Sequence, residues 1–163
     1  MPDGPVLPGS GWRSADIGSV AEAGRAEGHD GGLRVLTSGT NLLGREDSLH
    51  FVYREFDGSG QWMGRVLDTE SRLTGTKVGF VIREQLSSGA RQVVLLAGGA
   101  EGGESGDGDA VFFGVRGAPG YSMGLVAERP VRLPRWIKLA RSGSQFSAFT
   151  SGDGRKWTLL GRV

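Results

Sequence analysis

The stretch RSGSQFSAFTSGDGRKW, residues 141–157, holds two turn signals on either side of a short alternating segment. Small residues in RSGS separate WIKLA from QFSAFTS, which is the composition of a β-hairpin turn. The Asp153–Gly154 step before WTLLG is a strong hairpin signal, because Asp can accept amide protons of its own turn and Gly can take a positive φ. These residues could also form a ligand-binding motif, but the turn interpretation needs no ligand. We predict two consecutive hairpins, with the ring of Trp157 packing over the second turn.

The rest of the chain repeats this pattern of short runs and turn residues. Runs rich in Val, Ile, Phe and Trp recur at a spacing of about 8–12 residues, which is typical of an all-β sandwich or barrel, and about eleven strands fit. No window of helical length keeps an apolar stripe without a glycine cluster interrupting it. One short helical turn is expected in NLLGREDS, residues 41–48.

Alternation assigns faces to two of the expected strands. In residues 77–84 it predicts that Phe80 and Ile82 face the core together with Val78, and that Arg83 faces the other side together with Lys77, Gly79 and Val81. Residues 50–56 carry bulky side chains on both faces, which predicts a central strand. Arg54 would be a candidate ligand contact if it faces a concave surface.

Five stretches, taken in chain order, resemble domains of the concanavalin A-like lectin/glucanase superfamily: GWRSADIGSV, DSLHFVYREFDGSGQWMGRV, TKVGFVIREQLSSGARQ, WIKLARSGSQF and SGDGRKW. Within that superfamily, the motifs resemble those of uncharacterised domains carried by bacterial extracellular multidomain proteins, over about residues 11–163. The resemblance implies an all-β, concanavalin A-like jelly-roll sandwich of two antiparallel sheets. It also implies an extracytoplasmic location, periplasmic or extracellular, and framework roles for Trp12, Trp136 and Trp157.

With 163 residues, one domain is expected. Residues 1–11, rich in Pro and Gly, are expected to be a flexible arm or linker, and residues 12–163 a single β-sandwich domain. Domains of the family usually continue past the last Trp strand with closing strands, whereas this sequence stops at Val163. The resemblance therefore predicts an open sheet edge that a partner subunit, a neighbouring copy or the arm covers.

Composition excludes several classes of protein. The formal net charge of +1 argues against nucleic acid as a partner, because phosphate binding needs a strongly positive face. The absence of cysteine excludes disulfides, thiolate zinc sites and cysteine nucleophiles. No apolar run predicts a transmembrane segment, and no signal peptide is visible. Arginine dominates the basic residues, which suits protein or carboxylate contacts, although GC-rich coding gives the same bias.

No catalytic or metal-binding motif is recognisable, so we expect neither an enzyme nor a cofactor. Glucanases of the superfamily use a Glu-x-Asp-x-x-Glu strand, and here Glu55 and Asp57 run into a glycine turn with no second Glu. His29 and His50 are isolated. The loop acids Glu101, Glu104, Asp107 and Asp109 lack EF-hand spacing, which leaves Asp107 and Asp109 as weak calcium candidates.

Two functions remain. In the first, the chain is a structural or interaction subunit that docks onto a larger extracytoplasmic protein assembly. In the second, it is a carbohydrate-binding module that uses the concave sheet face, with contacts at Arg54, Trp62, Arg83 and Tyr121.

Overall fold

The computed structural model describes residues 11–29, 31–69, 75–99 and 108–163, which form twelve strands and no helix. This composition confirms that the fold is all-β, and the strand number is close to the expected one. The strands belong to two compact units. The N-terminal unit ends at Asp57 and also includes Glu84–Arg91 and Gly117–Met123, whereas the sandwich unit comprises Gly58–Arg83, Gln92–Arg116 and Gly124–Val163. Because the segments of the two units alternate along the chain, no single linker separates them.

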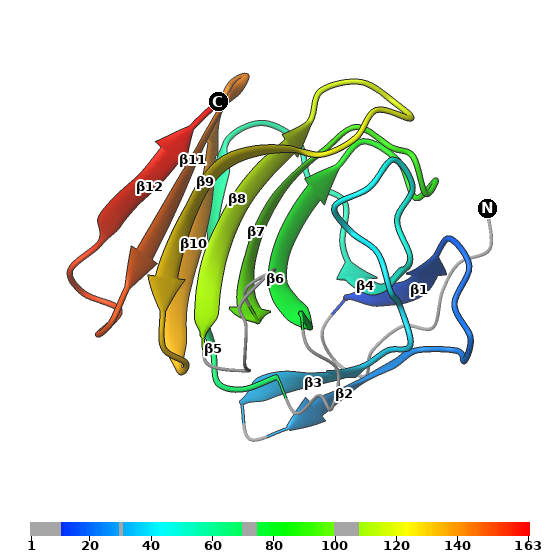
Figure 1. Ribbon diagram of the computed structural model, residues 1–163, viewed down its shortest axis with the longest axis horizontal. Helices are drawn as coiled ribbons and strands as arrows, with labels where there is room; N and C mark the ends of the chain where they lie inside the picture. The colour runs from blue at the N-terminus through cyan, green and yellow to red at the C-terminus, as the bar shows by residue number, and fades with distance from the viewer. Residues whose placement is uncertain (1–10, 30, 70–74, 100–107) are drawn as a thin grey trace. The chain divides into compact units, whose positions relative to one another are not determined.

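The sandwich unit is built from two antiparallel four-stranded sheets (Figure 1). One sheet has the order β12-β11-β10-β5, and the other has the order β6-β7-β8-β9. The strands are β5 (Gly60–Val66), β6 (Lys77–Arg83), β7 (Gln92–Gly99), β8 (Asp109–Arg116), β9 (Gly124–Val131), β10 (Arg135–Ser142), β11 (Gln145–Ser151) and β12 (Thr158–Arg162). Contacts between the sheets join β10 to β7, β12 to β9 and β5 to β6, so the sheets lie face to face.

The core of the sandwich unit lies between these sheets. Its buried members come from five strands: Val66, Val93, Leu95, Ala97, Val111, Phe113, Ile137, Leu139 and Ala148. Phe80 and Ile82 pack against them, which confirms the face that alternation predicted for these two residues. Val78, which was expected in the core with them, is 37% exposed, so that part of the prediction is wrong. In β7, Val94 and Leu96 point away from this core and are buried as well. Burial on both faces explains why this strand reads as a continuous apolar run.

The two predicted hairpins between Arg141 and Trp157 are present. Gly143 takes a φ of 60° in the turn between β10 and β11, and Gly154 takes a φ of 71° in the turn before β12. In the second turn, Oδ1 of Asp153 accepts the backbone N–H groups of residues 155 and 156, each at 2.8 Å. The ring against Gly154 is that of Trp136, since a Cβ there would lie 2.9 Å from it. The ring of Trp157 instead contacts Lys138.

These hydrogen bonds make the second turn sensitive to acid. Backbone N–H groups of Lys156 and then Arg155, and next the Ser151 hydroxyl, hold the pKa of Asp153 below its ordinary value of 3.8. A carboxyl whose pKa is lower in the folded state stabilises the fold above its unfolded pKa, and this contribution is lost as the pH falls through the folded pKa. We expect Asp153→Asn to unfold at a lower urea concentration than the wild type at pH 7, and the difference to shrink below about pH 4. The urea midpoints of both proteins, determined from pH 7 to about pH 2, measure this difference and its change with pH.

Ser144→Ala, in the other hairpin turn, is the control because it removes no ionisable group. Its difference from the wild type should not change with pH. A constant difference for Asp153→Asn over the whole range would contradict the role given to the carboxylate.

The N-terminal unit contains two two-stranded sheets. β1 (Arg13–Ile17) pairs with β4 (Leu49–Tyr53), and β2 (Arg25–His29) pairs with β3 (Gly32–Leu36). Because β1 is the only strand beside β4 in the described part of the chain, the prediction of a central strand over residues 50–56 is wrong. The helical turn expected in residues 41–48 is also wrong. That segment is a loop closed by a bridge between Asn41 and Ser48, and the Asn41 side chain accepts two of its N–H groups.

Candidate functional site

A hollow of about 310 Å³ lies in the N-terminal unit at the end of the β1–β4 pair. Among the described residues its lining consists of Gly11, Arg13, Tyr53, Arg54 and Glu55. The pairing register explains this grouping, because Arg13 lies directly opposite Tyr53. The next pair outward in the same register would be Trp12 and Arg54, and Cζ of Arg54 does lie 5.2 Å from the centre of the Trp12 ring. Arg54, a predicted ligand contact, therefore lines a real depression.

The hollow combines cationic, anionic and aromatic side chains. Its described lining includes two guanidinium groups, of Arg13 and Arg54, and one carboxylate, of Glu55. Tyr53 is 9% exposed, and its ring stacks on that of Phe51 at 5.6 Å. Within the described part of the chain, neither Arg54 nor Glu55 forms an ion pair. Such a lining can bind a small polar molecule through charge-assisted hydrogen bonds.

The other predicted contacts do not share one sheet face. Trp62, on β5, is paired with the buried Leu139 and therefore points to the core side, where its ring lies against Gly60. Arg83, at the end of β6, is paired with Gln92 on the side away from the core. Tyr121 belongs to the N-terminal unit and is 69% exposed. Trp62 and Arg83, which both belong to the sandwich unit, therefore do not lie on one sheet face.

Of the two calcium candidates, the structure describes only Asp109. Asp107 lies outside the described residues, as do Glu101 and Glu104. Asp109, at the start of β8, uses Oδ2 to accept the backbone N–H of Leu133 at 3.2 Å, which connects β8 to the turn after β9. No group of three or more His, Asp or Glu side chains that could hold a metal occurs among the residues the structure describes.

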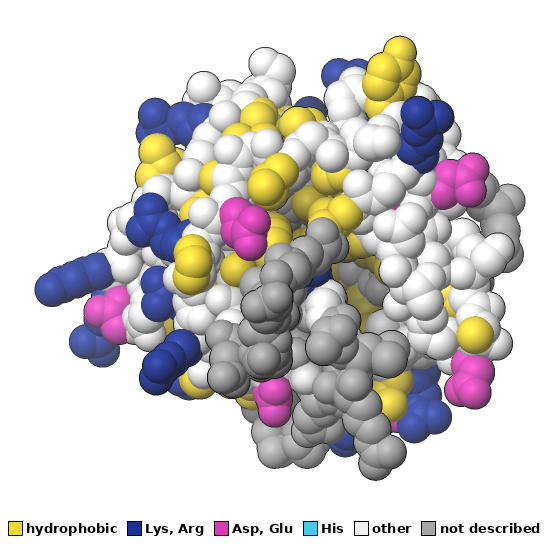
Figure 2. Space-filling model, in the orientation of Figure 1, with side chains coloured by type: hydrophobic (Ala, Val, Ile, Leu, Met, Phe, Trp, Pro, Cys, Tyr) yellow, Lys and Arg dark blue, Asp and Glu magenta, His cyan; other side chains and the backbone are white. Residues whose placement is uncertain are grey.

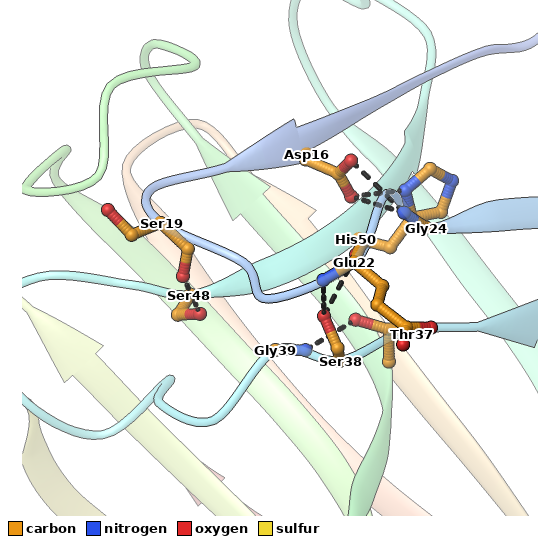
Figure 3. Close-up of polar contacts among 9 residues, drawn as sticks. All are labelled: Asp16, Ser19, Glu22, Gly24, Thr37, Ser38, Gly39, Ser48 and His50. Atoms are coloured by element: carbon orange, nitrogen blue, oxygen red, sulfur yellow. Dashed lines mark hydrogen bonds and ion pairs between the residues drawn. The ribbon is translucent and has the colours of Figure 1, made fainter.

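A partly buried Asp–His pair lies in the N-terminal unit and was not predicted (Figure 3). Asp16 on β1 and His50 on β4 are direct partners in the strand register. Nδ1 of His50 is 2.8 Å from Oδ1 of Asp16, and both carboxylate oxygens accept the N–H of Gly24 at 3.1 Å. The His50 side chain is 3% exposed. Nε2 of His50 is also buried and has no hydrogen-bond partner in the described chain. Through the hydrogen bonds of Asp16, the pair connects β1, β4 and the segment at Gly24.

An apolar edge is present on the sandwich unit. β9 and β12 are the outer strands of their sheets and contact each other across the sandwich. Their exposed apolar side chains are Leu125 at 62%, Val126 at 36% and Leu159 at 39%. Arg129 and Arg162, on the same two strands, are exposed as well. We call these five residues the β9/β12 edge.

On the outer face of the β12-β11-β10-β5 sheet, Lys138 lies between two aromatic rings. Its Nζ is 4.6 Å from the centre of the Phe149 ring and 4.4 Å from that of Trp157. Register places Lys138 opposite both Phe149 and Met63, so a row of large side chains crosses three strands here. Because the ammonium group lies over these rings, it competes with any sugar that would stack on them.

The space-filling view shows hydrophobic side chains reaching the surface in several places, with Lys and Arg standing out around the rim of the viewed face (Figure 2). Within the described chain, no helix is long and apolar enough to cross a membrane. No protein family, curated protein or solved structure matches this chain.

Proposed function

We propose that this chain is a non-catalytic β-sandwich recognition module, a structural or interaction subunit that docks onto a larger extracytoplasmic protein assembly through the β9/β12 edge. The observation that carries the proposal is the exposure of Leu125, Val126 and Leu159 on two outer strands that contact each other. Outer strands present backbone groups that pair with no strand of their own sheet, and an incoming strand can bind to them. Register places Leu125 and Leu159 on the outer faces of their two sheets, where they add area that a partner covering this edge would bury.

The chemistry of the partner follows from the residues around this edge. The exposed charged residues of β9 and β12 are Arg129, Arg162 and Glu128, so the two strands together carry a net positive charge that favours a partner segment with Asp or Glu next to its apolar residues. Pro130, within β9, has no N–H to offer, which leaves β12 as the better edge for continuous pairing. The proposed partner is therefore a protein that presents an extended, apolar segment flanked by acidic residues.

The jelly-roll topology and the extracytoplasmic location are part of the same proposal. Two stacked, antiparallel four-stranded sheets and the series of family-like motifs support a concanavalin A-like jelly-roll. An extracytoplasmic location rests on the resemblance to domains of extracellular proteins alone. The carbohydrate-binding alternative has weaker support on the sheets, because Lys138 lies over the rings of Phe149 and Trp157 and because Trp62 points to the core side.

The edge can be tested with the substitution Leu125→Glu. A carboxylate in an apolar interface would lose its water without gaining a partner, so we expect binding to fall at least about tenfold. The measurement is a quantitative pull-down from cells of the native source, followed by titration of the purified partner. The matched control is Leu33→Glu, which places the same charge at a leucine that is 50% exposed in the N-terminal unit.

The proposal requires one partner, captured in fixed stoichiometry, that is retained by Leu33→Glu and lost by Leu125→Glu. Equal capture by both variants would place docking elsewhere. Self-association of the purified chain that Leu125→Glu abolishes would replace the protein partner with a second copy. Retention on a polysaccharide that is lost on Trp62→Ala would favour the carbohydrate-binding alternative.

A further inference from the structure

The hollow beside Arg54 is a candidate small-molecule site that is independent of the proposed docking edge. Its described lining residues all belong to the N-terminal unit, whereas the β9/β12 edge belongs to the sandwich unit. Its volume of about 310 Å³ lies at the lower end of the roughly 300–1,000 Å³ that is usual for ligand pockets. A molecule of this size is one small ring or chain, not an oligosaccharide.

The position of Arg54 favours a carboxylate as one part of the ligand. Cζ of the guanidinium group lies 5.2 Å from the centre of the Trp12 ring, within the range of a cation–π contact. The N–H donors of a guanidinium group lie in its plane and match a carboxylate with two parallel hydrogen bonds. The contact with Trp12 also restricts the side chain before binding, which lowers the entropy lost when a ligand binds.

Glu55 adds a second requirement. An ionised carboxylate is only an acceptor, so a ligand that fits beside it must bring hydrogen-bond donors. A simple inorganic or small organic anion would be repelled by Glu55 and would offer it no donor. A hydroxylated acid satisfies both side chains, because its carboxylate faces Arg54 while its hydroxyl groups donate to Glu55.

We infer that the hollow lined by Arg13, Tyr53, Arg54 and Glu55 binds a small hydroxylated carboxylate of about the size of one sugar acid. Arg54 holds the carboxylate, Glu55 accepts from the hydroxyl groups, and Tyr53 bounds the hollow. The hollow is open to solvent, so the expected Kd is roughly millimolar.

Titration of the full chain with glucuronate tests this inference, with the amide signals of residues 53–55 followed by NMR. Glucose, which lacks the carboxylate, and acetate, which lacks the hydroxyl groups, are expected to bind at least about tenfold more weakly. Arg54→Ala is expected to weaken glucuronate binding by roughly ten- to a hundredfold, since a charge-assisted pair is lost. The affinity of Arg54→Lys for glucuronate should fall between those of the wild type and Arg54→Ala, because lysine keeps the charge and loses the two-pronged geometry.

Matched variants separate this site from a general attraction to anions. Arg25→Ala removes an exposed arginine of the same unit, with a side chain 69% exposed, and should leave glucuronate binding unchanged. Glu55→Gln should weaken the binding of glucuronate but not that of acetate. Equal affinity for acetate and glucuronate, equal loss in Arg25→Ala and Arg54→Ala, or no shift of the amides of residues 53–55 would each overturn the inference. Leu125→Glu, which tests docking, should bind glucuronate as the wild type does, so the two proposals can fail separately.

Discussion

Replacing Phe113 by alanine is expected to lower the free energy of unfolding by about 3–5 kcal/mol, which is the usual cost of removing a large buried ring. Phe113 lies on β8 between the two sheets and is 0% exposed. Truncation leaves a cavity that the surrounding strands can fill only partly, because both sheets are held by their hydrogen bonds. Native proteins have free energies of unfolding of about 5–15 kcal/mol, so this single change removes a large fraction of the total. Urea unfolding of the wild type and the variant, with equal slopes, measures the loss.

Two further variants test whether the loss comes from the core. Phe149→Ala removes the same ring from the outer face of β11, where it is only partly buried, and should cost clearly less. Gly161→Ala adds a methyl group 3.1 Å from Cδ1 of Phe113 and 3.3 Å from Cγ1 of Val126. Its cost should therefore be smaller when Phe113 is already alanine, as a double-mutant cycle would show. Equal losses for Phe113→Ala and Phe149→Ala would contradict the placement of the core.

Local chemistry explains why the hairpins between Arg141 and Trp157 were predictable. The Asp153–Gly154 step contains both the acceptor that the turn amides need and the residue that takes the positive φ. The faces of Phe80 and Ile82 were also predictable from local sequence, because side chains of a strand point alternately to its two faces. Which ring covers Gly154 depends on pairing between strands, and for this reason Trp136 was missed.

Longer-range pairing limited the prediction of the N-terminal unit and of its hollow. β1 and β4 are separated by more than thirty residues, and no spacing in the sequence indicates that they pair with each other alone. Arg54 was selected as a contact, but Arg13 reaches the same hollow only through this register. The Asp16–His50 pair was missed on the same grounds, since two isolated residues meet there across the strands.

A glycine in the middle of β6 leads to the second large expected effect. A Cβ on Gly79 would lie 2.1 Å from the carbonyl oxygen of Leu95 and 2.8 Å from Cα of Leu96, both in the backbone of β7. A flexible side chain could move aside, but a backbone paired on both sides within a sheet cannot do so cheaply. Gly79→Ala is therefore expected to lower the free energy of unfolding by roughly 1–3 kcal/mol, the usual cost of overpacking, although it adds only one methyl group.

Gly28→Ala is the matched control, because it makes the same change in β2 where an added Cβ meets nothing within 4 Å. Since alanine has less backbone freedom than glycine in the unfolded chain, this variant is expected to be neutral or more stable by about 0.4–1 kcal/mol. The opposite signs of the two changes, measured by urea unfolding in one buffer, isolate the steric contact from the general effect of replacing glycine. A Gly79→Ala protein as stable as Gly28→Ala would mean that β6 and β7 do not approach each other as closely as this pairing requires.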